Sequence, residues 1–175
     1  MPLLLLACGL AIAGCASSKT ISEATTVAPA GHPPGAEPSA SSKMICSDEA
    51  QKDIAASLGV KATVSTPTWV DDVYACKYVY PTGTITLSVK ELTNEAATTA
   101  AYKSSATQLG RRPEVVTFGQ GAFITTNGSV IVRKDFKVLD VDVSKIPEKF
   151  GSPPQDRSNV ALSIAATVMS CWTGA

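Results

Sequence analysis

Histidine is nearly absent from this sequence, and its scarcity limits the catalytic chemistry open to the chain. The single histidine, His32, lies in a stretch rich in Pro, Ala, Ser and Thr. A general base that works near neutral pH is most often a histidine, so the folded part cannot assemble a Ser-His or Cys-His nucleophile system. Scattered cysteines without histidine also predict no metal site. We therefore expect no catalytic residues, no metal and no cofactor.

Carboxylate pairs are a catalytic chemistry that this composition leaves open. Glycoside hydrolysis needs only two carboxyl groups, about 5 to 10 Å apart, and the candidates are Asp71, Asp72 and Asp142. Asp140 and Asp142 alternate along an apolar stretch, so they share one face of a strand. Such acids are more typical of a solvated strand face than of a cation site.

A cysteine follows the apolar segment at the start of the chain. Residues 1–14, MPLLLLACGLAIAG, carry no charged side chain and are shorter than the roughly 20 apolar residues of a membrane-spanning helix, which indicates a secretion signal peptide. Small residues before Cys15 suit a signal-peptidase site, and the stretch resembles the lipobox of bacterial lipoproteins. This resemblance implies cleavage before Cys15, a diacylglycerol on its thiol and further acylation, for example with palmitate. Several acyl chains would form a firm lipid anchor in the membrane.

The segment after Cys15 has the composition of a linker. Residues 16–43 are mainly Ser, Thr, Ala, Pro and Gly without an aromatic residue, so they cannot bury enough apolar surface to fold. We therefore expect a signal peptide over residues 1–14, a lipidated cysteine with a disordered linker over 15–43, and one globular domain over 44–175. Since 15 basic residues balance 15 acidic ones, the charge indicates no nucleic-acid partner.

Three cysteines lie in the predicted domain, namely Cys46, Cys76 and Cys171. In an exported protein they are disulfide candidates, and the odd number leaves one thiol free. We favour a disulfide between Cys46 and Cys76, because Cys46 comes just before a predicted helix and Cys76 lies in a strand on which that helix would pack. Cys171 would then be a buried free thiol. The alternative pairs Cys46 with Cys171 and leaves Cys76 in the core.

Helix caps and alternating apolar residues predict an α+β domain. Ser47 begins a helix that ends at Gly59, Asn94 begins a second that closes at Gly110, and a third follows Asp156. The segments between the helices predict strands over residues 73–80, 84–92, 114–118, 122–126, 129–135 and 136–143. We expect an antiparallel β-sheet of about five to six strands packed against about three helices, in the order α-β-β-α-β-β-β-α.

An aromatic group is the best candidate for a ligand-binding face. It consists of Trp69, Tyr74, Tyr78 and Tyr80. Alternate residues of a strand point to the same side, so the three tyrosines share one face of the sheet. That face either lines a ligand groove or packs into the core.

The domain also resembles a family. Cys46 before a helix, Cys76-Lys77-Tyr78 in a strand, an alanine-rich helix with Tyr102 and a closing apolar helix, all behind a lipobox, resemble uncharacterised actinobacterial (mycobacterial-type) cell-envelope lipoproteins. Some lipoproteins of this kind have folds similar to the PsbP and Mog1 proteins. The resemblance implies a binding domain without catalytic residues. The third cysteine departs from the family pattern.

Two hypotheses for function follow from these observations. The first is a non-enzymatic lipoprotein at the outer face of the cell membrane, whose partners are the membrane, through lipid on Cys15, and an envelope protein or an apolar ligand such as a lipid. The alternative is a carboxylate-based enzyme that acts on envelope polysaccharide.

Overall fold

The structure is a computed structural model that describes residues 34–172. The predicted lipid-bearing Cys15, the signal peptide over residues 1–14 and most of the predicted linker lie outside this range. Within the described residues, no helix has the length and hydropathy of a membrane-spanning segment. The described part has an α+β fold, which confirms the predicted fold class.

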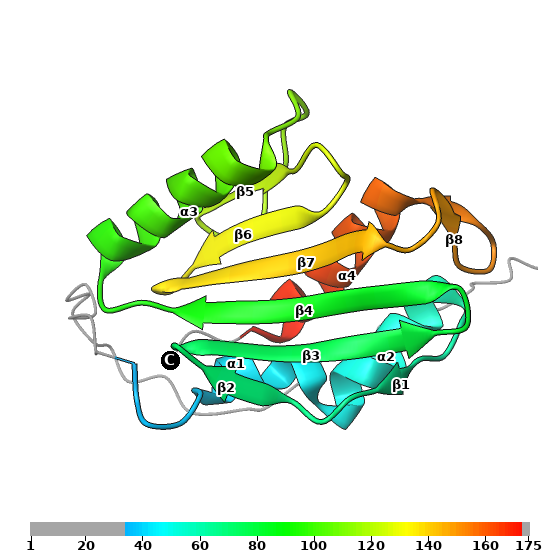
Figure 1. The fold of residues 1–175 in the computed structure, drawn as a ribbon, viewed down its shortest axis with the longest axis horizontal. Helices are drawn as coiled ribbons and strands as arrows, with labels where there is room; N and C mark the ends of the chain where they lie inside the picture. The colour runs from blue at the N-terminus through cyan, green and yellow to red at the C-terminus, as the bar shows by residue number, and fades with distance from the viewer. Residues whose placement is uncertain (1–33, 173–175) are drawn as a thin grey trace, which may run out of the picture.

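A seven-stranded antiparallel sheet forms the centre of the domain (Figure 1). Its strands lie in the spatial order β1-β3-β4-β7-β6-β5, and β2 also pairs with β3. The strands of this sheet are β1 (Thr63–Val64), β2 (Thr68–Val70), β3 (Val73–Tyr80), β4 (Gly83–Glu91), β5 (Gly121–Ile124), β6 (Val130–Lys134) and β7 (Lys137–Lys145). A separate two-stranded sheet consists of β8 (Lys149–Phe150) and β9 (Gln155–Asp156). The long strands β3, β4 and β7 thus form the middle of the main sheet.

In the part of the chain that the structure describes, four α-helices and a short 3₁₀ helix accompany the sheet. They are α1 (Ala40–Lys43), the 3₁₀ helix η1 (Met44–Cys46), α2 (Asp48–Leu58), α3 (Glu95–Leu109) and α4 (Arg157–Cys171). The predicted caps are confirmed, because Ser47 and Asn94 each accept a hydrogen bond from a backbone amide of the first helical turn. α2 ends at Gly59, whose φ of 65° lies in the left-handed region that favours glycine.

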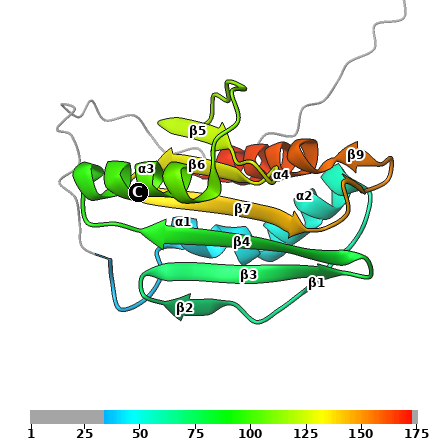
Figure 2. The same ribbon diagram turned by 45° about the horizontal axis from the view of Figure 1, so that its top comes forward.

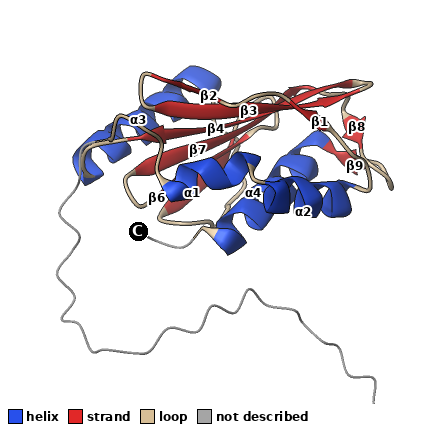
Figure 3. Cartoon of the chain, turned by 90° about the horizontal axis from the view of Figure 1, so that it is seen from below, coloured by secondary structure: helices blue, strands red, loops and turns tan. Residues whose placement is uncertain are grey.

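Alternation along the central strands produces two cores, one on each face of the sheet. On the first face, Leu87 and Leu139 pack with Ile54 of α2 and Ile164 of α4. Figure 3 shows α1, α2 and α4 together along this side. On the opposite face, α3 covers a smaller core that consists of Phe123, Ile131 and Val138. In Figure 2, α3 lies at the β5–β6 end of the domain and leaves β3 and the first part of β4 uncovered.

The folded domain begins earlier than the sequence predicted. Residues 40–43, assigned to the linker from their composition, form α1, and both Ser41 and Ser42 are buried. Glu91 explains this difference. This residue is 8 % exposed, and its carboxylate accepts hydrogen bonds from the backbone amide of Ser39 at 2.8 Å and from the hydroxyl of Ser42. Hydrogen bonds to Glu91 therefore hold residues 39–43 on the domain, although this segment shows no pattern of apolar residues in the sequence.

The pKa of Glu91 reflects the same contacts. Burial by itself raises this pKa, but the hydrogen bonds from Ser39 and Ser42, together with the charge of Lys137, outweigh burial and lower the pKa below its ordinary value. A lowered carboxyl pKa contributes stability above the pKa of the unfolded chain, near 4.3, and that contribution is lost as the pH falls through the folded-state pKa.

We predict that Glu91→Gln lowers the free energy of unfolding by about 1 kcal/mol at pH 7, because the hydrogen bonds lose their charge assistance. The difference from the wild type should begin to shrink as the pH falls below about 4.3, the pKa of the unfolded chain, and should go on shrinking through the lower folded-state pKa of Glu91. Urea unfolding of both proteins at several pH values measures this difference in the free energy of unfolding. Glu37→Gln is the matched control, since the exposed Glu37 forms its one ion pair among residues 34–172 with Lys43 on the same segment. An equal loss at pH 3 and pH 7 would contradict the prediction.

The strand predictions were wrong at one position and incomplete at others. Residues 114–118 form no strand; only Val116 makes an isolated bridge, to Ala122, and Val115 is 87 % exposed. The short strands β1 and β2 were not predicted, because two or three residues are too few to show alternation. The predicted hairpin at Asn127–Gly128 is confirmed between β5 and β6.

Candidate functional site

A disulfide ties the start of the helical layer to the sheet. Cys46 of η1 and Cys76 of β3 are bonded to each other, 30 residues apart in the chain, with Cα atoms separated by 6.1 Å. This is the favoured pairing, so the alternative of Cys46 with Cys171 is wrong. Cys171 is the free cysteine of the described residues, and it is half-buried where a buried thiol was predicted.

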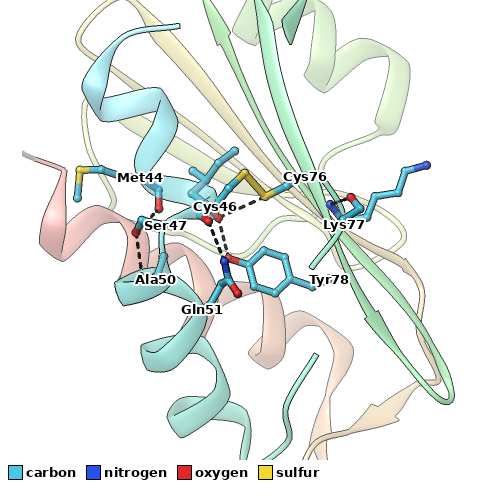
Figure 4. The surroundings of a disulfide bond; sticks show 10 residues. Met44, Cys46, Ser47, Ala50, Gln51, Cys76, Lys77 and Tyr78 are labelled. Atoms are coloured by element: carbon cyan, nitrogen blue, oxygen red, sulfur yellow. Dashed lines mark hydrogen bonds between the residues drawn. A yellow bond between two sulfur atoms is a disulfide. The ribbon is translucent and has the colours of Figure 1, made fainter. Parts of the chain in front are cut away.

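Two side chains satisfy the backbone carbonyls beside this disulfide (Figure 4). The hydroxyl of Tyr78 donates a hydrogen bond to the carbonyl oxygen of Ile45 at 2.7 Å. The side-chain amide of Gln51 donates to the carbonyl oxygen of Cys46 at 2.9 Å. These bonds fix the start of α2 against β3, and so they set the distance between that helix and the edge of the sheet.

A groove of about 550 Å³ lies between α2 and the β1 edge of the sheet. Its floor is formed by Tyr78 and Tyr80 of β3, and its walls by α2 on one side and residues 59–64 on the other. The apolar wall residues are small: Ala55, Ala56, Val60, Ala62 and Val64. Gln51, Lys52 and Lys61 add polar groups. The volume falls within the range of small-ligand sites, which are typically apolar with a few polar groups.

No protein-family model, curated protein or solved structure matches the chain.

The two tyrosines on the floor of the groove differ in their hydrogen bonding. Tyr78 has the partner described above, whereas the buried hydroxyl of Tyr80 has no partner among the residues that the structure describes. Burial raises the pKa of Tyr80 to about 12 and that of Tyr78 still further above its ordinary value. Both hydroxyls therefore stay protonated at neutral pH, and the hydroxyl of Tyr80 can still donate a hydrogen bond.

The predicted aromatic face is divided between the groove and the core. Tyr74, Tyr78 and Tyr80 project from one side of β3, as predicted, and Trp69 of β2 pairs with Tyr74. Only Tyr78 and Tyr80 line the groove. Tyr74 is half-buried against the core. Core packing is confirmed for Tyr78 and Tyr80, which also form the groove floor, and a ligand in that groove stays a prediction.

The candidate carboxylates do not form one cluster. Asp71 and Asp72 occupy the turn between β2 and β3. Asp142 of β7 lies opposite Thr86 of β4, and Thr86 in turn lies opposite Lys77 of β3. Lys77 is five residues beyond Asp72, which is roughly 17 Å along a strand. That separation exceeds the spacing that a glycosidase needs.

Asp140 and Asp142 do share one face of β7, as predicted, but Asp140 is not the solvated acid that was expected, because its Oδ1 is buried without a hydrogen-bond partner among the described residues. Asp142 accepts hydrogen bonds from the hydroxyl of Ser129 at 3.3 Å and from the backbone amide of Ser144 at 2.8 Å. Burial first, and the charge of Asp142 second, raise the pKa of Asp140 to about 7. Near neutral pH the carboxyl group of Asp140 is therefore partly protonated.

A group that the sequence did not reveal lies between α2 and α4. The ligand atoms of Glu49, Asp53 and Cys171 lie within 4.8 Å of one another. The i, i+4 spacing of Glu49 and Asp53 places both on one helix face, but the approach of Cys171 depends on the packing of α2 against α4. Exposed acidic groups of this kind are common without an ion.

Proposed function

We propose that this protein is a non-catalytic binding domain held at the outer face of the cell membrane by lipid on Cys15, and that the groove between α2 and β1 takes an apolar ligand. The observation that carries the ligand site is the lining of the groove, in which small aliphatic side chains surround two tyrosine rings. Such a lining favours aliphatic chains over charged or strongly hydrated ligands. An envelope protein that inserts an apolar side chain is the related possibility.

The lipid anchor and the location depend on other observations. The lipobox-like segment ending at Cys15 and the resemblance to actinobacterial envelope lipoproteins support them. The Cys46–Cys76 disulfide is also typical of an exported protein. Mass spectrometry of the protein from its native membrane tests this part of the proposal, because an unmodified Cys15 would contradict it.

We predict that a bulky side chain in the groove wall prevents ligand binding. Ala56 is exposed on α2 and lines the groove, so Ala56→Trp fills the groove without entering the core. The neutral probe N-phenyl-1-naphthylamine should bind the wild type with increased fluorescence and bind Ala56→Trp about tenfold more weakly, because the indole displaces it from apolar surface.

Ala100→Trp is the matched control for this experiment. Ala100 is an exposed alanine on α3, on the opposite face of the sheet, and its substitution should leave probe binding unchanged. Circular dichroism checks that both variants are folded. Equal binding by the wild type and Ala56→Trp, or no binding by the wild type, would contradict the groove as a ligand site.

The second candidate function is a carboxylate-based enzyme acting on envelope polysaccharide. Asp140 and Asp142 favour it, because adjacent positions on one strand face are roughly 6.6 Å apart and the pKa of Asp140 is raised by burial and by the neighbouring Asp142. Asp142, however, is already engaged by Ser129 and Ser144. Release of reducing ends from cell-wall polysaccharide that depends on Asp142 would favour this candidate over the binding domain.

A further inference from the structure

The two ends of the groove differ in chemistry. Thr63 pairs with Val79 and Val64 with Tyr78, so the chain just before β1, which carries Lys61, runs beside Tyr80. Lys52 belongs to the other end, because it follows Gln51, whose amide lies next to the Tyr78 hydroxyl (Figure 4). The groove therefore has a Tyr80–Lys61 end and a Tyr78–Lys52 end.

Tyr80, which lines the groove at the first of these ends, carries a buried hydroxyl that is an unsatisfied donor. Tyr80 is only 5 % exposed, and its ring packs edge-on against that of Phe150, with the ring centroids 4.8 Å apart. The hydroxyl has no hydrogen-bond partner within residues 34–172. Leaving a buried donor unpaired is costly, and phenylalanine would fill the same space without that cost. A ligand with an acceptor oxygen would satisfy the donor.

Lys61 adds a positive charge at the same end. It is exposed, lines the groove, and makes no ion pair or side-chain hydrogen bond in the described part of the chain. A lysine can lay its aliphatic stem along an apolar wall and keep its ammonium group at the rim. An acidic group at this end can therefore meet both a hydrogen-bond donor and a cation.

We infer that the groove binds an amphiphile with one aliphatic chain and an acidic oxygen head group, either a carboxylate or a phosphate. This inference rests on the proposed function of the groove. The head group accepts a hydrogen bond from Tyr80 and pairs with Lys61. The chain runs along the alanines of α2 toward Tyr78, where the hydroxyl is already satisfied by Ile45 and offers no competing donor.

Competition for the bound fluorescent probe tests the inference. The protein is the full chain with Cys15→Ala, so that neither a membrane nor a detergent competes for the probe. Decanoate, decyl phosphate and 1-decanol each displace N-phenyl-1-naphthylamine at pH 7.5. We expect at least one of the two acids to displace it at about tenfold lower concentration than the alcohol, because the acid adds a charge-assisted hydrogen bond. Whichever acid is stronger identifies the head group as carboxylate or phosphate.

Substitutions at the two ends locate the head group. Lys61→Met and Tyr80→Phe should each reduce the preference for the acid over the alcohol by about fivefold, since each removes one contact of the acidic oxygen. Lys52→Met, at the Tyr78 end of the same groove, should leave the preference unchanged. The preference is the ratio of the displacing concentrations of alcohol and acid within one variant, so a change in that variant's affinity for the probe does not alter it.

Three results would overturn the inference. The first is equal displacement of the probe by the acids and the alcohol. The second is a preference for the acid that survives both Lys61→Met and Tyr80→Phe. The third is a preference for the acid that is lost in Lys52→Met alone. In each case the proposed ligand site would still stand if the wild type binds the probe and Ala56→Trp does not. Absence of probe binding to the wild type would instead refute the proposed function itself.

Discussion

Removal of the Cys46–Cys76 disulfide should lower the free energy of unfolding by about 3.5 kcal/mol, because the closed loop restricts the unfolded chain. The bond spans 30 residues and joins η1 to the centre of β3. Both cysteines are buried, so Cys46→Ala with Cys76→Ala is the variant that leaves no free thiol behind. Urea denaturation followed by circular dichroism measures the change under oxidising conditions.

Cys171→Ala is the control for the disulfide experiment. Cys171 has no disulfide partner and is half-buried, so its substitution should change the unfolding midpoint far less than the double substitution. Adding a reductant should bring the wild type close to the double variant and leave the double variant unaffected. Identical midpoints for the oxidised wild type and the double variant would show that the disulfide is not a major source of stability.

Phe123→Ala should lower the free energy of unfolding by about 3 to 5 kcal/mol, as expected for deletion of a buried aromatic ring. Phe123 is fully buried in the small core beneath α3. Its ring meets Tyr102 edge-on at 5.2 Å, and the guanidinium of Arg111 lies 5.8 Å from its centroid. Because α3 packs on few apolar residues, we expect the amides of α3 to lose protection from hydrogen exchange before those of α2.

The control for Phe123 is Val115→Ala, since Val115 is 87 % exposed and its truncation removes little buried area. Urea unfolding measures both variants. Binding of N-phenyl-1-naphthylamine should be unchanged in folded Phe123→Ala, because the groove lies on the opposite face of the sheet. A loss of less than 1 kcal/mol would show that α3 is held mainly by other contacts.

Much of the fold was predictable from local signals. Ser47 and Asn94 begin helices and Gly59 ends one, because capping depends on hydrogen bonds and backbone angles within a few residues. Asn127–Gly128 marks a hairpin for the same reason. α1 could not be predicted, because its serines are buried by contact with Glu91, a residue that lies 49 positions beyond Ser42. That contact exists only once β4 has formed.

The candidate site was predictable in part. Tyr78 and Tyr80 followed from their alternation in a strand, and the Cys46–Cys76 disulfide from its place between a helix and that strand. The alanines of α2 that form the groove wall carried no such signal, since their role depends on how far α2 lies from β1. The unpaired hydroxyl of Tyr80 was equally hidden, because only the packing of the folded domain shows whether a donor finds a partner.

The attachment of residues 39–46 has a mechanical consequence. A pull from the amino-terminal side of the chain reaches Ser39 first and passes through Glu91 into β4, a central strand of the sheet. Any load that travels further meets Cys46 and enters β3 through a covalent bond. α2 lies beyond both attachments, so the helix that walls the groove carries little tension. The groove can keep its shape while the domain is under force.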